Sequence, residues 1–446
     1  MKIIIAGAGD VGFHLAQLLS YENQDIVLID TNQEVLENAA THLDVLTIRG
    51  DSASIRILEQ AGVDKAKLLI AVTTSEKNNI VTAILAKRLG ARKTIARVKT
   101  GEYLEETQRN SFREIGVDAL ISPNELAATE VNRLVDQCTF TDIFDFEGGK
   151  IKLLGITLDD QSSLINVPLQ ALETLKGEEA LMPIAILRHD QTIMPRGDTI
   201  MRRGDHVYFI APKDTITHLE NLIGAPKVEV QKVMIIGGTA LGLAVALHLE
   251  NDYHVTLIEN KRDRCKELSE KLDNTLIIHG NASNVSLLEE EGLNEMDVFI
   301  ALTNNSETNI ITSLTAKNHG VPKTIAQVEN TEYIHLSQNI GVDTLINRKL
   351  IAANNIFRYV RKGRIEAITS LHGVNAEVIE FIVHKSNQLT RKPLRALHLP
   401  KTALIGGVIR GSESMIPNGD FQLEVNDKVI VFALPDAIGK LEKLFR

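Results

Sequence analysis

Cysteine is scarce in this sequence, with only Cys138 and Cys265 among 446 residues. Two isolated cysteines build neither a disulfide framework nor a zinc site, and such usage is typical of a protein in a reducing cytoplasm. The 13 histidines are scattered and form no H-E-x-x-H pair. We therefore expect no metal site.

Long apolar runs are also missing. No uncharged stretch approaches the roughly 20 residues of a transmembrane helix, so we expect no membrane span. The apolar run in "MKIIIAGAGD" is short for a signal peptide and continues as a glycine loop. A net charge of −10 argues against a broad basic face, so we expect no nucleic-acid partner.

Catalytic signatures are absent as well. The sequence has no G-x-S-x-G, no Cys–His signature and no Walker lysine. A dehydrogenase needs a positioned acid or base and a substrate domain. We therefore expect that the chain is not an enzyme.

The sequence repeats itself. Its glycine loops begin at Gly7 and Gly237, an offset of 230 positions (237 − 7). Four further segments recur in the same order: "LIDTN" (28–32) as "LIENK" (257–261) after one deletion, "GDS" (50–52) as "GNA" (280–282), "AVTTSEKNNI" (71–80) as "ALTNNSETNI" (301–310), and "TIARV" (94–98) as "TIAQV" (324–328). Five ordered matches predict an internal duplication.

Each repeat has two parts with different patterns. In the first part, six short apolar segments from "KIIIAGAG" to "DALISP" alternate with helical stretches such as "NNIVTAILAKRLG". This alternation predicts a Rossmann-like α/β fold, with a parallel sheet covered on both faces. The second part reads as strands, turns and one short helix, "VPLQALETL" or "KPLRALHLP", which predicts a small α+β domain.

The predicted organisation is a Rossmann-like domain followed by a small α+β domain, twice over. The predicted limits are 1–135 for the first Rossmann-like domain, 136–150 for a linker, 151–225 for the first small domain, 226–231 for a linker, 232–358 for the second Rossmann-like domain, 359–366 for a linker, and 367–446 for the second small domain.

The first glycine loop has the dinucleotide-binding pattern G-x-G-x-x-G between a predicted strand and helix. It consists of Gly7, Ala8, Gly9, Asp10, Val11 and Gly12. The first glycine allows the tight turn, the second lets the backbone approach a pyrophosphate, and the third permits close helix–strand packing. Asp30 ends the second strand, where it can accept both hydroxyls of an adenosine ribose and would repel a 2′-phosphate. The pattern predicts NAD(H) rather than NADP(H).

Further candidate ligand contacts follow the next strands, at the edge where such sheets bind ligands. Asp51 and Ser52 follow the third strand, and a helix N-cap is the alternative reading. Thr73 and Thr74 follow the fourth, where turn chemistry is the alternative. Arg97 lies in the fifth strand, where it could hold a phosphate or pair with a carboxylate at an interface.

The second loop is an altered copy. It consists of Gly237, Gly238, Thr239, Ala240, Leu241 and Gly242, with Glu259 in the place of the aspartate. Thr239 puts a side chain where the backbone should touch pyrophosphate, and Asn281 and Gln327 replace Asp51 and Arg97. Two readings stay open: a weaker site, or one with a different nucleotide preference, and a purely structural domain.

The segment "SPNE" (122–125) reads as a helix start, with a serine N-cap, proline at the first position and a glutamate that reaches back. The helix that it opens has an apolar stripe made of Leu126, Ala127, Val131 and Leu134. This stripe fits either ordinary core packing or a helix that leaves its own domain to pack on a partner.

The order of domains and the motifs "IIIAGAGDVG", "LIDTN", "RGDSA" and "AVTTSEKNNIVTAILAKRLG" resemble the RCK (KTN) regulatory proteins of potassium transport, most closely their TrkA-type members. The resemblance covers the whole chain. It implies a cytoplasmic protein, peripheral on the inner face of the membrane, that forms a homo-oligomeric ring, a tetramer, beneath a membrane potassium-translocating Trk-type subunit.

The resemblance also implies that nucleotide binding changes the ring and gates transport. We expect NADH and ATP or ADP to compete for the first site, with Arg97 discriminating between them. A soluble NAD-dependent oxidoreductase and a scaffold with a vestigial cleft are the alternatives. Duplicated nucleotide domains without catalytic groups favour the regulatory reading, because a ligand acts on conformation only through its differential affinity for two states.

Overall fold

The computed structural model describes residues 1–20, 24–99, 101–172, 180–189, 191–224, 229–330, 333, 341–361, 365–370 and 376–445. The chain divides into two compact units. The first consists of Met1–Thr129 with Asn347–Val360, and the second of Glu130–Ile346 with Arg361–Arg446.

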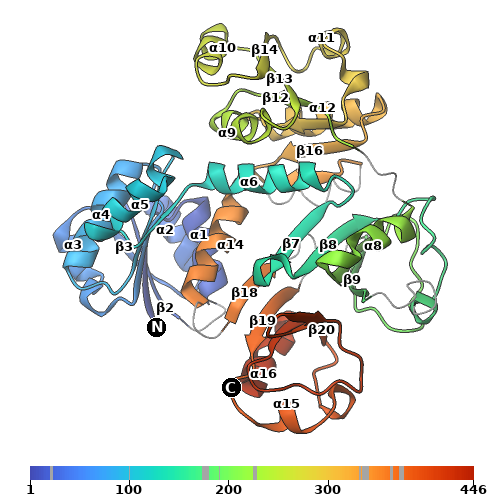
Figure 1. Cartoon of the computed structure of the whole chain (residues 1–446). Coiled ribbons are helices and arrows are strands. Elements are labelled where there is room, and N and C mark those ends of the chain that lie inside the picture. The colour runs from blue at the N-terminus through green and yellow to red at the C-terminus, as the bar shows by residue number, and fades with distance from the viewer. Residues whose placement is uncertain are drawn as a thin grey trace. The chain divides into compact units, whose positions relative to one another are not determined.

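The first unit contains a six-stranded parallel sheet in the order β3-β2-β1-β4-β5-β6, drawn in blue to cyan in Figure 1. Its strands are β1 (Lys2–Ala6), β2 (Asp25–Asp30), β3 (Leu46–Arg49), β4 (Leu68–Ala71), β5 (Thr94–Arg97) and β6 (Ala119–Ile121). Its helices are α1 (Asp10–Ser20), α2 (Gln33–His42), α3 (Ile55–Gln60), α4 (Glu76–Arg88), α5 (Glu106–Glu114) and the start of α6 (Pro123–Asp136). This confirms the predicted Rossmann-like fold, whose strand order reverses between β1 and β4.

Alternate residues of β1 face opposite sides of the sheet, and both sides are covered. Ile4 packs with α3 and α4 in one core that also includes Leu58 and Ala86. On the other side, α1 packs so closely that a Cβ added to Gly12 would lie 3.5 Å from the Ile5 side chain. The glycine loop between β1 and α1 is thereby fixed at the carboxyl edge of the sheet.

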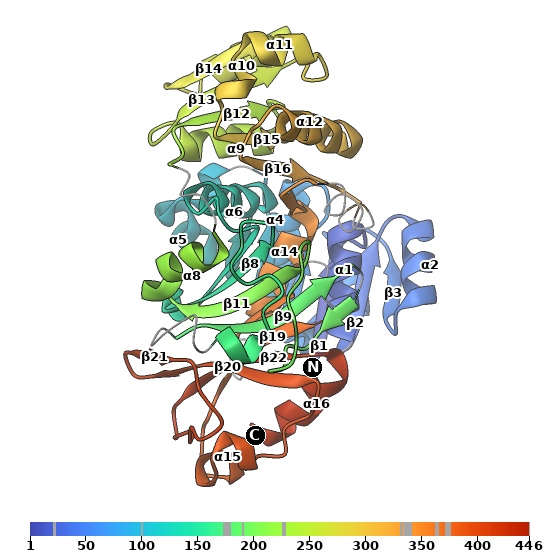
Figure 2. The same cartoon turned by 90° about the vertical axis from the view of Figure 1, so that its right-hand side faces the viewer.

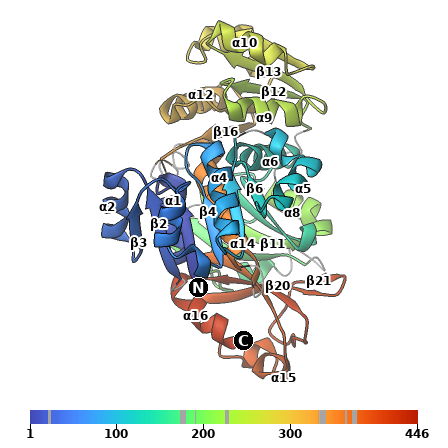
Figure 3. The ribbon, with the colours of Figure 1, turned by 90° about the vertical axis from the view of Figure 1, so that its left-hand side faces the viewer.

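One helix of the first unit comes from the second half of the sequence. α14 (Arg348–Arg361) is drawn in orange among the blue elements in Figures 1 and 3. The buried Asn347 begins it, because its side-chain oxygen accepts hydrogen bonds from the N–H groups of Lys349 and Leu350 at 3.0 and 3.1 Å. This is the usual way to satisfy the first free N–H groups of a helix.

The second unit contains the second parallel sheet, in the order β14-β13-β12-β15-β16-β17, which is yellow to orange in Figure 2. Its strands are β12 (Lys232–Ile236), β13 (His254–Glu259), β14 (Thr275–His279), β15 (Val298–Ala301), β16 (Lys323–Gln327) and β17 (Thr344–Ile346). The helices are α9 (Ala240–Leu249), α10 (Arg262–Ser269), α11 (Val285–Glu290) and α12 (Ser306–Asn318). The same strand order in both halves agrees with the predicted duplication.

Two five-stranded antiparallel sheets complete the second unit, with the orders β10-β9-β11-β8-β7 and β18-β19-β22-β20-β21. The first has β7 (Asp142–Phe146), β8 (Ile151–Thr157), β9 (Met182–Arg188), β10 (Gln191–Ile193), β11 (His206–Pro212) and α8 (Ile216–Ile223). The second has β18 (Ile365–Ser370), β19 (Glu377–Ile382), α15 (Gln388–Arg391), β20 (Ala403–Arg410), β21 (Glu413–Met415), β22 (Lys428–Ala433) and α16 (Pro435–Leu444). These are the two predicted α+β domains.

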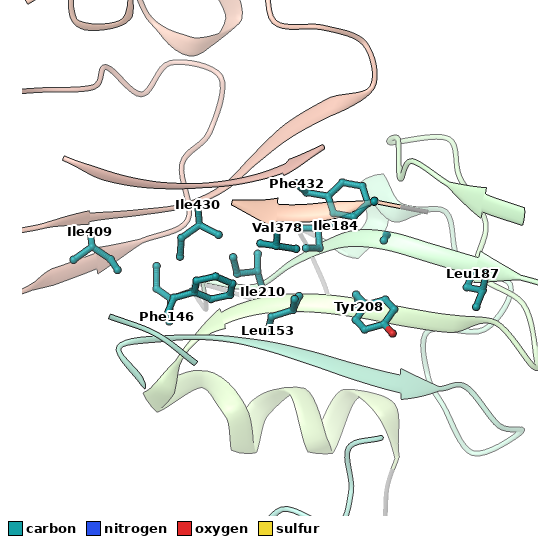
Figure 4. Packing of buried hydrophobic residues seen from close by; sticks show 13 residues of the cluster. Phe146, Leu153, Ile184, Leu187, Tyr208, Ile210, Val378, Ile409, Ile430 and Phe432 are labelled. Atoms are coloured by element: carbon teal, nitrogen blue, oxygen red, sulfur yellow. The ribbon is translucent and has the colours of Figure 1, made fainter. Parts of the chain in front are cut away.

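The two antiparallel sheets share one hydrophobic core. Figure 4 shows Tyr208 and Ile210 of the first sheet with Val378 and Phe432 of the second. Gly407 in β20 allows the close approach, since a Cβ there would lie 2.9 Å from the Ile151 side chain. The small domains therefore bury their apolar faces against each other within one chain.

A buried lysine joins the second parallel sheet to the loop before β7. Lys323, at the start of β16, is 3% exposed, and its ammonium donates to the Phe140 carbonyl over 2.7 Å. Burial lowers the pKa of Lys323. Nearby, the Tyr253 hydroxyl donates to the Asp136 carboxylate at the end of α6 over 2.7 Å. The last turn of α6 thus contacts a domain of the other repeat.

The structure departs from the sequence prediction in three places. The expected linker 136–150 contains the end of α6 and the strand β7, which pairs with β8 because its apolar residues complete the small sheet. The expected linker 359–366 contains the last turn of α14 and the start of β18. The expected short helices are 3-10 turns at Leu169–Ala171 and Leu394–Ala396, although residues 173–175 of the first lie outside the described part.

The predicted helix start at 122–125 is present, since the Ser122 hydroxyl accepts a hydrogen bond from the Glu125 N–H at 3.4 Å. Ala127, Val131 and Leu134 of the predicted stripe are buried. None of the helices in the described part of the chain has the length and apolar composition that a bilayer span requires.

Candidate functional site

The first glycine loop lies between β1 and α1, next to the end of β4. Gly7 has φ +104°, and a Cβ there would lie 2.8 Å from the backbone nitrogen of Thr73. A Cβ on Gly12 would lie only 1.8 Å from the Gly7 carbonyl oxygen. The fold itself therefore requires these two glycines.

Gly9 is different, because a Cβ added there would meet no atom within 4 Å. Its φ lies outside the range that disfavours side chains. The packing of the chain thus gives no reason for glycine at this position. A bare backbone next to the first turn of α1, whose N–H groups have no carbonyl one turn earlier, is what a pyrophosphate needs.

Asp30 lies at the end of β2 and faces the loop. Its two carboxylate oxygens accept hydrogen bonds from the N–H groups of Ala8 and Asn32, at 2.8 and 2.9 Å. Each oxygen has a further lone pair, so the half-buried carboxylate can still accept ribose hydroxyls. Of the remaining loop residues, Val11 is buried and Asp10 is exposed, so Val11 offers a ligand only its backbone.

Asp51 and Ser52 do not share one role. Asp51 is exposed and accepts from the Ala53 N–H at 3.0 Å and from the Asn78 amide at 3.2 Å. The Ser52 side chain is buried and lies 3.0 Å from the Thr82 hydroxyl of α4. Asp51 therefore stays near the solvent at the sheet edge, whereas Ser52 fastens its loop to α4. Neither is the N-cap of α3, which is Ser54.

Thr73 and Arg97 are held together by a residue that the sequence reading missed. The buried Asn79 accepts from the N–H and the hydroxyl of Thr73, at 2.9 and 2.6 Å. Its amide donates to the carbonyls of Thr73 and Arg97, at 3.1 and 2.9 Å. Asn79 thus joins the ends of β4 and β5, while Thr74 is exposed. A sequence signal existed, since Asn309 occupies the matching position of the second repeat.

The second half rebuilds this junction. Asn309 accepts from the N–H and hydroxyl of Thr303, at 2.9 and 2.6 Å, and donates to the Gln327 carbonyl at 2.9 Å. Gly237 and Gly242 are again required by packing, since added Cβ atoms would lie 2.8 and 2.1 Å from backbone atoms. The glycines that the fold needs are retained in both repeats.

The second loop differs where a ligand would approach. Thr239 replaces the open glycine, and its hydroxyl accepts from the Gly242 N–H at 3.1 Å and donates to the Leu302 carbonyl at 3.0 Å. The loop therefore caps α9 with its own side chain. One of the N–H groups that would meet a phosphate already has a partner.

Other side chains also close around the second loop. Glu259 is 9% exposed, and its carboxylate accepts from the N–H groups of Gly238 and Lys261, both at 2.8 Å. Arg264 donates to the Gly238 carbonyl at 2.7 Å, and a Cβ on Gly238 would lie 2.5 Å from Leu268. Leu241 is buried, and Ala240 has no carboxylate to match Asp10. The second loop is thus bonded to its own surroundings more extensively than the first.

Neither Cys138 nor Cys265 forms a disulfide, and burial raises the pKa of both thiols. Within the described ranges, no three histidine, cysteine, aspartate or glutamate side chains gather as metal ligands would.

Comparison with known proteins matches both repeats to family models. The TrkA-N domain matches residues 3–123 and 233–348, and the TrkA-C domain matches residues 153–224 and 378–446. Together these spans cover most of the chain.

Curated relatives match over their full length. The chain is 33% identical over 455 residues to "Trk system potassium uptake protein TrkA homolog 1" of Methanosarcina mazei, which covers 100% of both chains. It is 34% identical over 451 residues to "Trk system potassium uptake protein TrkA" of Halomonas elongata, covering 100% of this chain and 99% of the relative.

Among solved structures, the GsuK RCK domain superposes with a TM-score of 0.61 at 16% identity, covering 100% of this chain and 94% of that one. The GsuK channel bound to NAD superposes with a TM-score of 0.60 at 16% identity, covering 100% of this chain and 78% of that one. These likenesses show a shared RCK fold. With both repeats matched to TrkA domains and full-length relatives above 30% identity, the chain belongs to the TrkA family of Trk potassium uptake proteins.

Proposed function

We propose that the chain is a nucleotide-binding regulatory subunit that gates a membrane potassium transporter. The observation that carries the proposal is the open space around Gly9. Gly7 and Gly12 are explained by packing, whereas Gly9 leaves open backbone that only a ligand needs. The residues at this edge fit NAD(H): the loop and the first turn of α1 for the pyrophosphate, and Asp30 for the adenosine ribose. When bound, the nucleotide would supply the signal, and no reaction is required of it.

Adenine nucleotides are proposed to compete for the same site. ATP or ADP presents the same adenosine to Asp30 but ends in a charged phosphate. Arg97, at the end of β5, is the residue expected to favour such an anion. Thr73 and Thr74 would face the second ribose and nicotinamide of NADH. Solved GsuK channels of the same fold are described as bound to NAD and bound to ADP, which supports this choice of ligands.

We propose that the second repeat binds NAD(H) more weakly than the first. Thr239 occupies the position of Gly9 and already bonds the Gly242 N–H. Asn281 and Gln327 replace Asp51 and Arg97, and the buried Glu259 replaces Asp30. Thr239 fills an opening, and Asn281 and Gln327 each remove a charge, whereas Glu259 keeps the carboxylate in a buried position.

The regulatory role rests on the family. The relatives are named as potassium uptake proteins, so the proposed partner is a Trk-type membrane subunit that carries potassium. The chain would sit in the cytoplasm, peripheral on the inner face of the membrane. We retain the predicted domain limits except at two linkers. The first shortens to 137–141, because α6 ends at Asp136 and β7 begins at Asp142. The last shortens to 362–364, because α14 ends at Arg361 and β18 begins at Ile365.

A homo-oligomer, specifically a tetramer, is part of the proposal. Both parallel-sheet domains expose hydrophobic side chains at matching positions: Leu46 and Leu276, Ile55 and Val285, and Val81 and Ile311. A pocket between α11 and α12 is lined in part by two of these residues, Val285 and Ile311. Repeated exposure of this kind suits assembly surfaces. Light scattering that shows only monomer across micromolar concentrations would contradict the tetramer.

Calorimetric titration of the full chain tests the binding proposal. We expect NADH to bind and ATP to displace it. We expect Gly9→Thr to weaken the binding of both nucleotides. If neither ligand gives a heat of binding, the proposed nucleotide site is refuted. Incubation with NADH and a panel of ketones and aldehydes tests the alternative, since steady turnover would indicate an oxidoreductase instead.

A further inference from the structure

The N-terminus of α14 brings a cation to the first glycine loop. The Lys349 ammonium lies 2.5 Å from the Asp10 carboxylate, and both residues belong to the first unit. Asp10 is the first residue of α1 and directly follows Gly9. The side chains of Lys349 and Asp10 are 32% and 72% exposed, so the pair borders the solvent. A lysine from the second repeat is thus held next to the loop of the first.

Hydrogen bonds at the start of α14 hold the backbone of Lys349 in place. Arg348 donates to the Asn124 side-chain oxygen at 3.1 Å, which joins the first turns of α14 and α6. The buried Asn347 caps α14 through the N–H groups of Lys349 and Leu350. The backbone that carries Lys349 is therefore fixed on both sides, while its long side chain can change partner.

The two repeats are not equivalent in this respect. The helix that begins after Ser122 in the first repeat has Asn124 at the position that corresponds to Lys349, counted from the cap residue. The second loop has Ala240 in place of Asp10. In the described part of the chain, the residue after the open glycine of the first loop is thus a carboxylate paired with a lysine, whereas the second loop has no carboxylate at that position.

We propose that Lys349 is a phosphate-binding residue of the first nucleotide site. This inference rests on the proposed function. A polyphosphate on the loop would compete with Asp10 for the ammonium, because a polyphosphate carries several negative charges and the exposed carboxylate carries one. ATP offers a terminal phosphate to the lysine, and NADH offers only its internal pyrophosphate. Lys349 therefore favours ATP over NADH. The lysine that contacts the phosphate belongs to α14, and β18 is the next element along the chain.

The test compares Lys349→Met, Lys349→Arg and the matched control Lys232→Met in the full chain. Lys232 is also in an exposed ion pair, with Glu295 at 2.7 Å, but it lies in the second repeat. Calorimetry with ATP, NADH and adenosine should show that Lys349→Met weakens ATP about 10-fold and NADH less. Adenosine, which has no phosphate, should bind as before, Lys349→Arg should restore most of the ATP affinity, and Lys232→Met should change nothing.

Equal losses for ATP, NADH and adenosine would overturn the inference, because they would indicate a structural role for the ion pair. Unchanged ATP binding by Lys349→Met would overturn it too. Failure of the wild-type chain to bind any nucleotide would instead refute the proposed function. The two failures are therefore distinguishable in one experiment.

Discussion

The hydroxyl of Thr239 accepts a hydrogen bond from the backbone N–H of Gly242 across 3.1 Å, so the second glycine loop caps its own helix. The first loop has Gly9 at this position, with open space where a side chain would be. At this position the second loop is bonded to itself, whereas the first has room for a further group.

The first prediction exchanges these two residues. Thr239→Gly should strengthen NADH binding by the second repeat about 10-fold, because it frees an N–H group and removes a side chain from the approach. The same change should cost the protein less than about 1 kcal/mol of stability, since glycine replaces a threonine cap with little loss. Titration in a Gly9→Thr background isolates the second repeat. No gain in affinity there would show that Glu259, Leu268 and Arg264 close the site without Thr239.

The second prediction concerns the acidic residues at the strand ends. Asp30→Ala should weaken NADH binding by the wild-type first site about 10- to 100-fold, because a charge-assisted contact with ribose is lost. Glu259→Ala is the matched control, and it should matter less for the main binding event. Calorimetry measures both, and equal effects of the two variants would place the main site in both repeats.

A third prediction addresses the small domains. Arg188 makes two hydrogen bonds to the Asp205 carboxylate, both at 2.8 Å, and Asp205 is 1% exposed. Arg188→Ala leaves that carboxylate buried without its cation and should cost about 3 kcal/mol of stability. Arg203→Ala, which breaks the exposed pair with Asp160, should cost less than about 1 kcal/mol. Urea denaturation of both variants checks this, and similar midpoints would contradict the assigned roles.

The fourth prediction is a pH dependence from Lys323. Burial lowers its pKa in the folded chain, so between the folded and unfolded pKa values the unfolded chain binds more protons. Stability from this group must therefore rise with pH in that window, below about 10.4. The melting temperature of the wild type relative to Lys323→Met should increase as the pH rises toward about 10.4. A difference that stays constant would mean that Lys323 is not desolvated.

Much of the fold could be predicted because its signals are local. The apolar segments and glycine turns identified all six strands of the first sheet, and the repeated motifs, at an offset near 230 residues, transferred the first five to the second. The strands β7 and β18 were missed, since edge strands of small sheets carry short patterns that resemble linkers. The shared core around Tyr208 and Phe432 could not be predicted either. The alternation of apolar residues in a strand shows that one face is buried, but not which other sheet packs on it.

The candidate site was predictable to a similar degree. The loop glycines and Asp30 follow from motif spacing, and the structure places them together. The bonding of Ser52 to Thr82 and the role of Asn79 depend on contacts between separate elements. The ion pair between Lys349 and Asp10 connects residues that are far apart in the sequence. Such a contact requires knowing that α14 packs on the other repeat, which the apolar stripe of the matching helix only suggested.

Potassium flux into vesicles that contain the Trk-type membrane subunit tests the regulatory role most directly. Moving a population from 1:99 to 99:1 requires about 5.5 kcal/mol of differential binding, which several coupled sites in an oligomer can supply. With the wild-type chain added, NADH, ADP and ATP should give different fluxes, and Gly9→Thr should abolish the differences. Identical flux with each nucleotide and with none would contradict nucleotide gating, even if binding itself were observed.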